Sequence, residues 1–190
     1  MPNYLASIED AVPILRSAGR VLVVGCSGGG KSTLAQRLAA RFALAYISMD
    51  RDFLWLPGWV LRERAGQRAL IAEAVKADRW IMDGNNAPSF DLRLPRTDIV
   101  LWVRLPRRLC LWGVAKRVVR HYGQTRPDMA EGCPEQLPDR AFLTYIWKFE
   151  KRHAPALIRS LDRYGPEVPV LTLKSHRETG KLLDLLDAAA

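Results

Sequence analysis

The chain alternates between short, wholly apolar runs and longer segments in which apolar residues recur every three or four positions. The run at residues 19–25 predicts a buried strand, and residues 98–104 repeat the pattern. The predicted strands cover residues 19–25, 43–48, 79–83, 98–104 and 169–174. The predicted helices cover residues 7–17, 32–42, 62–78, 107–121, 139–164 and 177–188, and Pro155 is expected to kink or divide the fifth of them.

This alternation predicts an α/β fold of three layers, in which helices cover both faces of a parallel sheet. Residues 123–138 are rich in glycine, proline and polar side chains and indicate a loop between two helices. No segment has the composition of an interdomain linker, and a length of 190 residues suits one domain. We therefore expect residues 1–190 to form a single unit.

A glycine-rich loop follows the first predicted strand and precedes a helix. Gly25, Gly30, Lys31 and Ser32 satisfy the pattern G-x-x-x-x-G-K-[ST] of the P-loop (Walker A motif). The glycines let successive backbone N–H groups point at phosphate oxygens, and the helix N-terminus adds its dipole. Lys31 is expected to reach the β- and γ-phosphates of ATP, and the Ser32 hydroxyl to bind Mg²⁺. The predicted nucleotide-binding residues are Gly25, Ser27, Gly28, Gly29, Gly30, Lys31, Ser32 and Thr33.

Two aspartates, Asp50 and Asp83, stand where predicted strands end. In open α/β sheets, ligands bind beyond the carboxyl ends of the strands. Asp83 is predicted to hold Mg²⁺, directly or through water, although Asp-Gly is also a turn signal and a plain turn residue is the alternative. For Asp50 three roles stay open: orienting the acceptor, accepting its proton, or capping the local turn.

The positive charge is concentrated in one part of the chain. The net charge is +9, and between Ile99 and Pro127 there are seven Lys or Arg residues and no Asp or Glu. Such a block suits nucleic acid, a small polyanion such as ATP, or a solvated helix face. No helix-turn-helix, RRM or zinc-finger signature accompanies it, so a nucleic-acid partner stays open but is not favoured.

The composition narrows the class of protein further. A hydrophobic content of 48% predicts a packed core, and the apolar runs are too short to cross a bilayer. The three cysteines have no C-x-x-C spacing, which argues against a disulfide framework or a zinc site and predicts a cytoplasmic location. The N-terminus has no basic region followed by an apolar run, so no signal peptide is expected.

The P-loop, the Asp83-Gly84 pair and the basic helix followed by a loop together resemble the adenylate-kinase-like branch of small nucleotide kinases. Asn85-Asn86-Ala87 departs from the aromatic-Pro-Arg that follows Asp-Gly in those enzymes. A closer resemblance is to the DNA topology modulation protein (FlaR-like) family of P-loop kinases. It rests on Met49-Asp50, Trp55-x-x-Gly58-Trp59 and residues 80–85, 91–95, 105–107, 109–112, 125–128 and 131–134, and it extends over residues 20–175.

This resemblance implies a five-stranded parallel sheet of order 2-3-1-4-5 and a short lid near residues 121–139. Kinases of this shape close lid arginines onto the transferring phosphates, because transfer spreads negative charge over the equatorial oxygens. The resemblance also implies that Arg117 or Arg120 lies against the adenine while other arginines reach phosphate. The lid candidates are Arg117, Arg120, Arg126 and Arg152, and the acceptor-side candidates are Asp50, Asn85 and Arg93.

The tryptophans divide into two groups. Trp55 and Trp59 lie in a Pro-Gly-containing loop near the expected acceptor pocket, where they either stack on a base or close an edge of the core. The tryptophans expected in the core are Trp80, Trp102, Trp112 and Trp147.

The function expected from these residues is ATP-dependent phosphoryl transfer to a small molecule, with nucleotides among the candidate acceptors. Lys31 binds the phosphates, and Ser32 and Asp83 organise Mg²⁺. A phosphate acceptor needs no general base, whereas for a hydroxyl acceptor Asp50 is the expected base. The alternative is a nucleic-acid-binding regulator that uses ATP as a switch.

Overall fold

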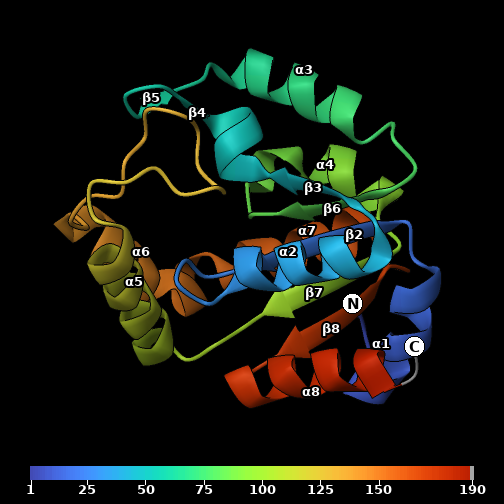
Figure 1. Ribbon diagram of the computed structural model, residues 1–190. Helices are drawn as coiled ribbons and strands as arrows, with labels where there is room; N and C mark the ends of the chain where they lie inside the picture. The colour runs from blue at the N-terminus through green and yellow to red at the C-terminus, as the bar shows by residue number, and fades with distance from the viewer. Residues whose placement is uncertain (189–190) are drawn as a thin grey trace.

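The computed structural model describes residues 1–188 and is built on a six-stranded parallel sheet with the order β1-β8-β7-β2-β6-β3 (Figure 1). The strands are β1 (Asn3–Tyr4), β2 (Arg20–Gly25), β3 (Ala45–Ser48), β6 (Trp80–Asp83), β7 (Ile99–Val103) and β8 (Pro169–Leu173). The five strands expected from the sequence are all present, and in their own numbering they follow the order 2-3-1-4-5.

The expected number of five strands is wrong, because β1 adds a sixth at the edge. It pairs in parallel with β8, with Asn3 opposite Pro169 and Tyr4 opposite Val170. Two residues are too few to produce a periodic pattern, so the sequence gives no signal for this strand. A second sheet, a two-stranded antiparallel ribbon of β4 (Trp55–Leu56) and β5 (Val60–Leu61), was also not expected.

Helices cover both faces of the main sheet (Figure 1). They are α1 (Ile8–Ser17), α2 (Lys31–Phe42), α3 (Arg64–Ala74), α4 (Phe90–Arg93), α5 (Arg107–His121), α6 (Arg140–Arg152), α7 (Ala154–Tyr164) and α8 (His176–Ala188). Buried side chains of α1, α2, α5, α6 and α8 form one core cluster, and those of α3, α4 and α7 form a second on the other face. The central strand β2 serves both clusters, since Val21 and Val23 face one and Leu22 and Val24 face the other.

The break in the predicted helix 139–164 is confirmed. α6 ends at Arg152 and α7 begins at Ala154, which makes Pro155 the second residue of the new helix. A proline is well tolerated in the first turn because its missing N–H has no intrahelical partner there. After β3 the chain forms a six-residue π-helical turn, η1 (Met49–Leu54), which is a conformation that has no simple sequence signal.

The expectation for the tryptophans is half right. Trp80 and Trp102 are fully buried, but Trp112 is 60% exposed and Trp147 is 45% exposed. Both exposed rings lie beside cations, with the guanidinium of Arg107 at 3.7 Å from the Trp147 ring centroid and the ammonium of Lys116 at 5.3 Å from that of Trp112. Within residues 1–188, no helix is long and apolar enough to cross a membrane.

Candidate active site

The phosphate loop lies between the end of β2 at Gly25 and the start of α2 at Lys31. Gly28 has a φ of +79°, and a Cβ on it would lie 2.1 Å from the carbonyl oxygen of Cys110 in α5. A Cβ on Gly113 of the same helix would lie 2.0 Å from the carbonyl oxygen of Gly28. Only glycine fits at these two positions, so the loop rests directly on the backbone of α5.

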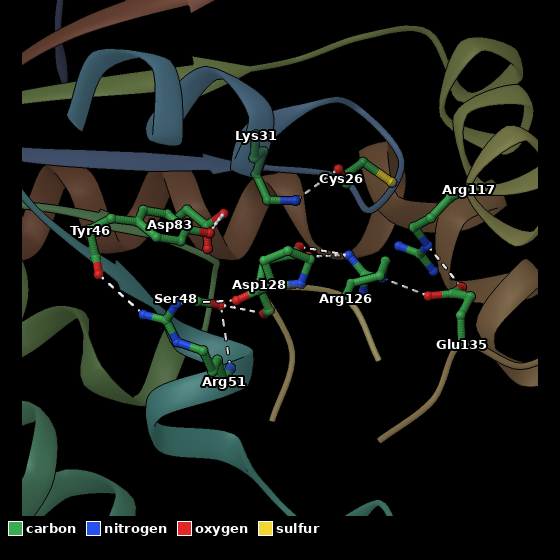
Figure 2. A network of polar contacts seen from close by, with 11 residues as sticks. Cys26, Lys31, Tyr46, Ser48, Arg51, Asp83, Arg117, Arg126, Asp128 and Glu135 are labelled. Carbon is green, nitrogen blue, oxygen red and sulfur yellow. Dashed lines mark hydrogen bonds and ion pairs between the residues drawn. The ribbon is translucent and has the colours of Figure 1, made fainter. Parts of the chain in front are cut away.

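The first turn of α2 is arranged to meet an anion. Its N-cap residue, Gly30, supplies no side-chain hydrogen bond to the first-turn N–H groups, which are therefore free to bind phosphate oxygens. Lys31 reaches back over the loop, and its ammonium donates to the carbonyl oxygen of Cys26 at 3.0 Å (Figure 2). The Ser32 side chain is half-buried, and Thr33 is exposed in the same turn.

Asp83 closes β6 beside this loop and is only 4% exposed. Burial raises the pKa of its carboxyl to about 6, a shift that Ser32 and Lys31 oppose and that the neighbouring Asp50 adds to. The Tyr46 hydroxyl donates to its Oδ2 at 3.1 Å. Asp83 thus lies with the hydroxyl of Ser32 at the carboxyl end of the strand, as a magnesium-binding role requires.

Asp50 follows β3 and lies in the first turn of η1. Its residue is exposed to solvent, yet surrounding protein groups desolvate its carboxylate and raise its pKa, while Lys31 and Arg126 act in the opposite direction. The N-cap of η1 is Ser48, whose Oγ accepts from the Arg51 N–H at 3.3 Å, while Oδ2 of Asp52 accepts from the Ser48 N–H at 2.8 Å. The Asp50 side chain makes no hydrogen bond with another described residue, and its roles as an orienting group or a proton acceptor stay predictions.

Arg117 of α5 and Arg126 of the following loop meet on one carboxylate (Figure 2). Arg117 Nε lies 2.9 Å from Oε1 of Glu135, and Arg126 Nε lies 2.8 Å from its Oε2. Arg126 also contacts both carboxylate oxygens of Asp128, the nearer at 2.6 Å. Burial lowers the pKa of Arg117, and the repulsion from Arg126 adds to that shift. Glu135 is 4% exposed, so the pair of arginines is held by a buried anion.

The loop 122–139, which we call the lid, is docked on the segment that follows β3. Ser48 Oγ donates to the Asp128 carbonyl at 2.8 Å, and the Gly58 N–H donates to Gly132 at 3.0 Å. Trp59 donates through Nε1 to Pro134 at 3.2 Å. Lid residues Met129, Ala130 and Cys133 form a small core with Trp55 and Trp59. In this conformation the two tryptophans close a core edge, one of the two roles that the sequence left open.

Asn85 joins the strand-end loop to the phosphate loop. Its Oδ1 accepts from the Gly25 N–H at 3.0 Å, and its Nδ2 donates to the Gly25 carbonyl at 2.8 Å. The same Nδ2 lies 3.3 Å from the hydroxyl of Tyr145 in α6. Asn85 therefore fixes the start of the phosphate loop, next to the place expected for the acceptor.

The expectation that Arg93 contacts the acceptor is corrected by its burial, because the side chain is 0% exposed. Its guanidinium donates to the carbonyls of Gly84, at 2.9 Å, and of Asn85 and Asn86, and it lies over the ring of Phe90. Burial lowers its pKa to about 9, so the group stays cationic at neutral pH. Arg93 supports the loop 84–86 from beneath and acts on the site only through that loop.

The remaining two lid candidates lie outside the arginine pair. Arg120 is exposed one turn beyond Arg117 and makes no hydrogen bond or ion pair to another described residue. Arg152 is exposed at the end of α6, beside His153 in a groove along that helix. The structure therefore brings Lys31, Asp50, Asp83, Arg117 and Arg126 together and leaves Arg120 and Arg152 apart from them.

Sequence reasoning missed the two acidic partners Asp128 and Glu135. A signal was available for Asp128, which follows Arg126 by two residues in a loop otherwise expected to carry free positive charge. Glu135 had no such signal, since its pairing with Arg117 depends on how the loop folds back. Together the site holds the cations Lys31, Arg117 and Arg126 and the anions Asp50, Asp83, Asp128 and Glu135. An anionic substrate in such surroundings is favoured when a divalent cation accompanies it.

The residues present fit ATP with Mg²⁺. The fit rests on the glycine-only contact between the loop and α5 and on the oxygen donors of Ser32 and Asp83, which are the hard ligands that Mg²⁺ takes. Within residues 1–188 no cluster of three or more His, Cys, Asp or Glu residues could hold a metal alone.

The fold is shared with small kinases of known structure. Shikimate kinase from Acinetobacter baumannii, solved in complex with shikimate, matches with a TM-score of 0.52 and 15% identity over 94% of this chain and 98% of that chain. Shikimate kinase from Bacteroides thetaiotaomicron matches with a TM-score of 0.51 and 16% identity over 90% of this chain and 96% of that chain. No family model and no curated protein matches the sequence. The chain thus has a P-loop kinase fold, and membership of the DNA topology modulation family stays a prediction.

Proposed function

We propose that this protein is an ATP-dependent phosphotransferase that acts on a small molecule. The observation that carries the proposal is the meeting in one site of the P-loop, with Lys31, and the arginine pair Arg117 and Arg126 (Figure 2). The P-loop supplies backbone donors at the start of α2. The likeness to shikimate kinases supports the fold on which this reading depends.

The residues have separate tasks in the transfer. The loop N–H groups and Lys31 bind the β- and γ-phosphates, and Ser32 and Asp83 are the residues that would hold Mg²⁺. When bound there, the ion would supply positive charge that neutralises the phosphate oxygens. An acceptor oxygen forms the new bond to the γ-phosphorus as the bond to the ADP oxygen breaks. Arg117 and Arg126 stabilise the charge that develops on the transferred group.

The fate of the proton depends on the acceptor. If the acceptor is a hydroxyl, its proton passes to Asp50, whose pKa is raised by desolvation. If the acceptor is a phosphate that is already ionised, Asp50 instead orients the acceptor molecule and takes no proton. The pH dependence of turnover distinguishes the two, because only the first requires an unprotonated Asp50.

The test is calorimetry of Mg-ATP binding to the wild type and to Lys31→Ala, followed by a screen of ATP consumption against nucleosides, nucleotides and small metabolites. We expect Lys31→Ala to stay folded and to lose nucleotide affinity. Lys76→Ala is the control, since that ammonium pairs with Glu73 on exposed α3. Unchanged affinity in folded Lys31→Ala would contradict the proposal.

The alternative, a nucleic-acid-binding regulator, finds less support in the site. Arg117 and Arg126, two of the seven cations in the basic block, are turned inward and paired with Glu135. A DNA surface needs charges that point outward along successive phosphates. A salt titration of duplex binding tests it, and a steep salt slope without nucleotide turnover would favour the regulator.

A further inference from the structure

A groove of about 450 Å³ runs along one face of α6. Its basic residues recur every four or eight positions, at Arg140, Lys148 and Arg152, so they share one helix face with Thr144. The groove is lined by Arg140, Ala141, Thr144, Tyr145, Lys148, Arg152 and His153. A volume in this range suits a small metabolite.

The charge of this groove is not neutralised within the described part of the chain. No carboxylate lines it, and Arg140, Lys148 and Arg152 form no ion pair or hydrogen bond with another residue of 1–188. The single carboxylate of α6, Glu150, is directed elsewhere and pairs with Arg104. This separates the groove from the lid, where Asp128 and Glu135 already balance Arg117 and Arg126.

Tyr145 links the lining of the groove to the phosphate loop by hydrogen bonds. The Tyr145 hydroxyl is 3.3 Å from Nδ2 of Asn85, and Asn85 is hydrogen bonded to Gly25 of the phosphate loop. Burial raises the pKa of Tyr145 to about 12, so the hydroxyl keeps its proton and can donate. The His153 ring packs on the Tyr145 ring with centroids 4.7 Å apart and forms the end of the groove.

We propose that this groove binds the phosphoryl acceptor, and that the acceptor carries a carboxylate or phosphate group held by Arg140, Lys148 and Arg152. The inference rests on the proposed function. It deepens that proposal by naming an anionic small molecule as the substrate class. The anionic group lies along α6, and the rest of the molecule extends past Tyr145 and Asn85 toward the phosphate loop. Thr144 and Tyr145 add neutral hydrogen-bond donors beside the three cations.

Either a carboxylate or a phosphate group of the acceptor fits the three cations, and two probes distinguish between them. The wild type is first saturated with Mg²⁺ and a non-hydrolysable ATP analogue, so that the P-loop no longer competes for anions. Citrate and inorganic phosphate are then titrated by calorimetry and by thermal shift. The test variant is Arg140→Gln/Lys148→Gln/Arg152→Gln, which changes exposed positions and should fold normally. Arg159→Gln on exposed α7 is the control for loss of a surface charge.

We expect at least one probe to bind the wild type and the triple variant to lose about tenfold or more in affinity, with the control unchanged. Citrate binding alone identifies a carboxylate site, and phosphate binding alone identifies a phosphate site. Once an acceptor is found by the screen, the triple variant should raise KM for it far more than it lowers kcat, since the groove binds and does not react.

Three outcomes would overturn the inference: no binding of either probe to the wild type at millimolar concentration, equal affinity in the triple variant, or loss of duplex DNA binding in that variant without any small-anion site. The failures can be told apart. Lys31→Ala tests the proposed function, because it should lose Mg-ATP binding. The groove variant tests only this inference, because it should bind Mg-ATP like the wild type.

Discussion

The Asn85 side chain makes two hydrogen bonds to the backbone of Gly25. Its Oδ1 accepts from the Gly25 N–H at 3.0 Å, and its Nδ2 donates to the Gly25 carbonyl at 2.8 Å. These bonds join the loop after β6 to the first residue of the phosphate loop. The end of β6 and the phosphate loop are therefore held at a fixed spacing by one amide. An amide is needed because both a donor and an acceptor are satisfied at once.

Replacing that amide should affect folding and nucleotide binding together. Asn85→Ala leaves the Gly25 N–H and carbonyl without these partners, and we expect a loss of roughly 1–3 kcal/mol in the free energy of unfolding. Mg-ATP affinity should fall as well. Denaturant unfolding and calorimetry measure the two effects. Asn3→Ala, which removes one exposed hydrogen bond to Glu167, is the control, and an equal effect from both variants would contradict the role of Asn85.

The raised pKa of Asp83 predicts how stability depends on pH in metal-free buffer. Between the ordinary value of 3.8 and about 6, the folded carboxyl keeps its proton while the unfolded one has lost it. The contribution of protonated Asp83 to the free energy of unfolding is therefore fully present below pH 3.8 and is lost as the pH rises through 6. Above that point the buried charge costs up to roughly 3 kcal/mol.

Asp83→Asn removes this dependence. Its free energy of unfolding should match that of the wild type near pH 4 and exceed it at pH 7.5, by a margin that shrinks when Mg-nucleotide is added. Urea unfolding across this pH range provides the measurement. Asp184→Asn, at an exposed position of α8, is the control. A difference between wild type and Asp83→Asn that is the same at both pH values would contradict the prediction.

Arg117 and Arg120 offer a matched pair on one helix. Arg117→Ala removes a cation that is paired with buried Glu135, and we expect phosphoryl transfer to fall at least about a hundredfold. Arg120→Ala changes an exposed residue without such a partner and should leave transfer nearly unchanged. Single-turnover kinetics with saturating Mg-ATP compares them. Equal losses of transfer rate in the two variants would contradict the prediction and indicate that Arg120 also acts in the site.

Arg93 should matter for stability more than for acceptor binding. Arg93→Met leaves the carbonyls of the loop 84–86 without their donor, and we expect a loss of about 2–4 kcal/mol. Hydrogen exchange should show faster opening of that loop, with KM for the acceptor little changed. Arg96→Met, which affects a partly exposed contact to Val75, is the comparison. A selective rise in acceptor KM without loss of stability would restore Arg93 to direct contact.

The sequence predicted some features of the fold and the site better than others. The P-loop and the strand-end Asp83 could be predicted because their chemistry depends on neighbours a few residues away in the chain. The strand order followed from the resemblance to known kinases and agrees with the structure. The pairing of Arg117 with Glu135, eighteen residues later in the chain, depends on the path of the lid and has no local signal.

Arg93 shows a different limit of sequence reasoning. An arginine after a strand-end loop usually indicates an exposed functional cation, because isolated guanidinium groups are rarely buried. Here the carbonyls of three successive residues replace a carboxylate partner, and this arrangement exists only once the loop has folded. The prediction that Trp112 lies in the core was wrong for a related reason, since a large apolar ring can lie on the surface beside Lys116.

The contact of Gly28 with Cys110 and Gly113 sets where the molecule can bend. The two backbones are so close that α5 can neither slide nor rotate about its axis without displacing the phosphate loop. If residues 122–139 open as the proposed lid, the hinges would lie at the ends of that segment, while the first half of α5 stays in place. A lid that hinges there can lengthen or shorten without changing the register between α5 and the nucleotide. A change in the length of the lid would therefore leave the phosphate loop and its contact with α5 intact.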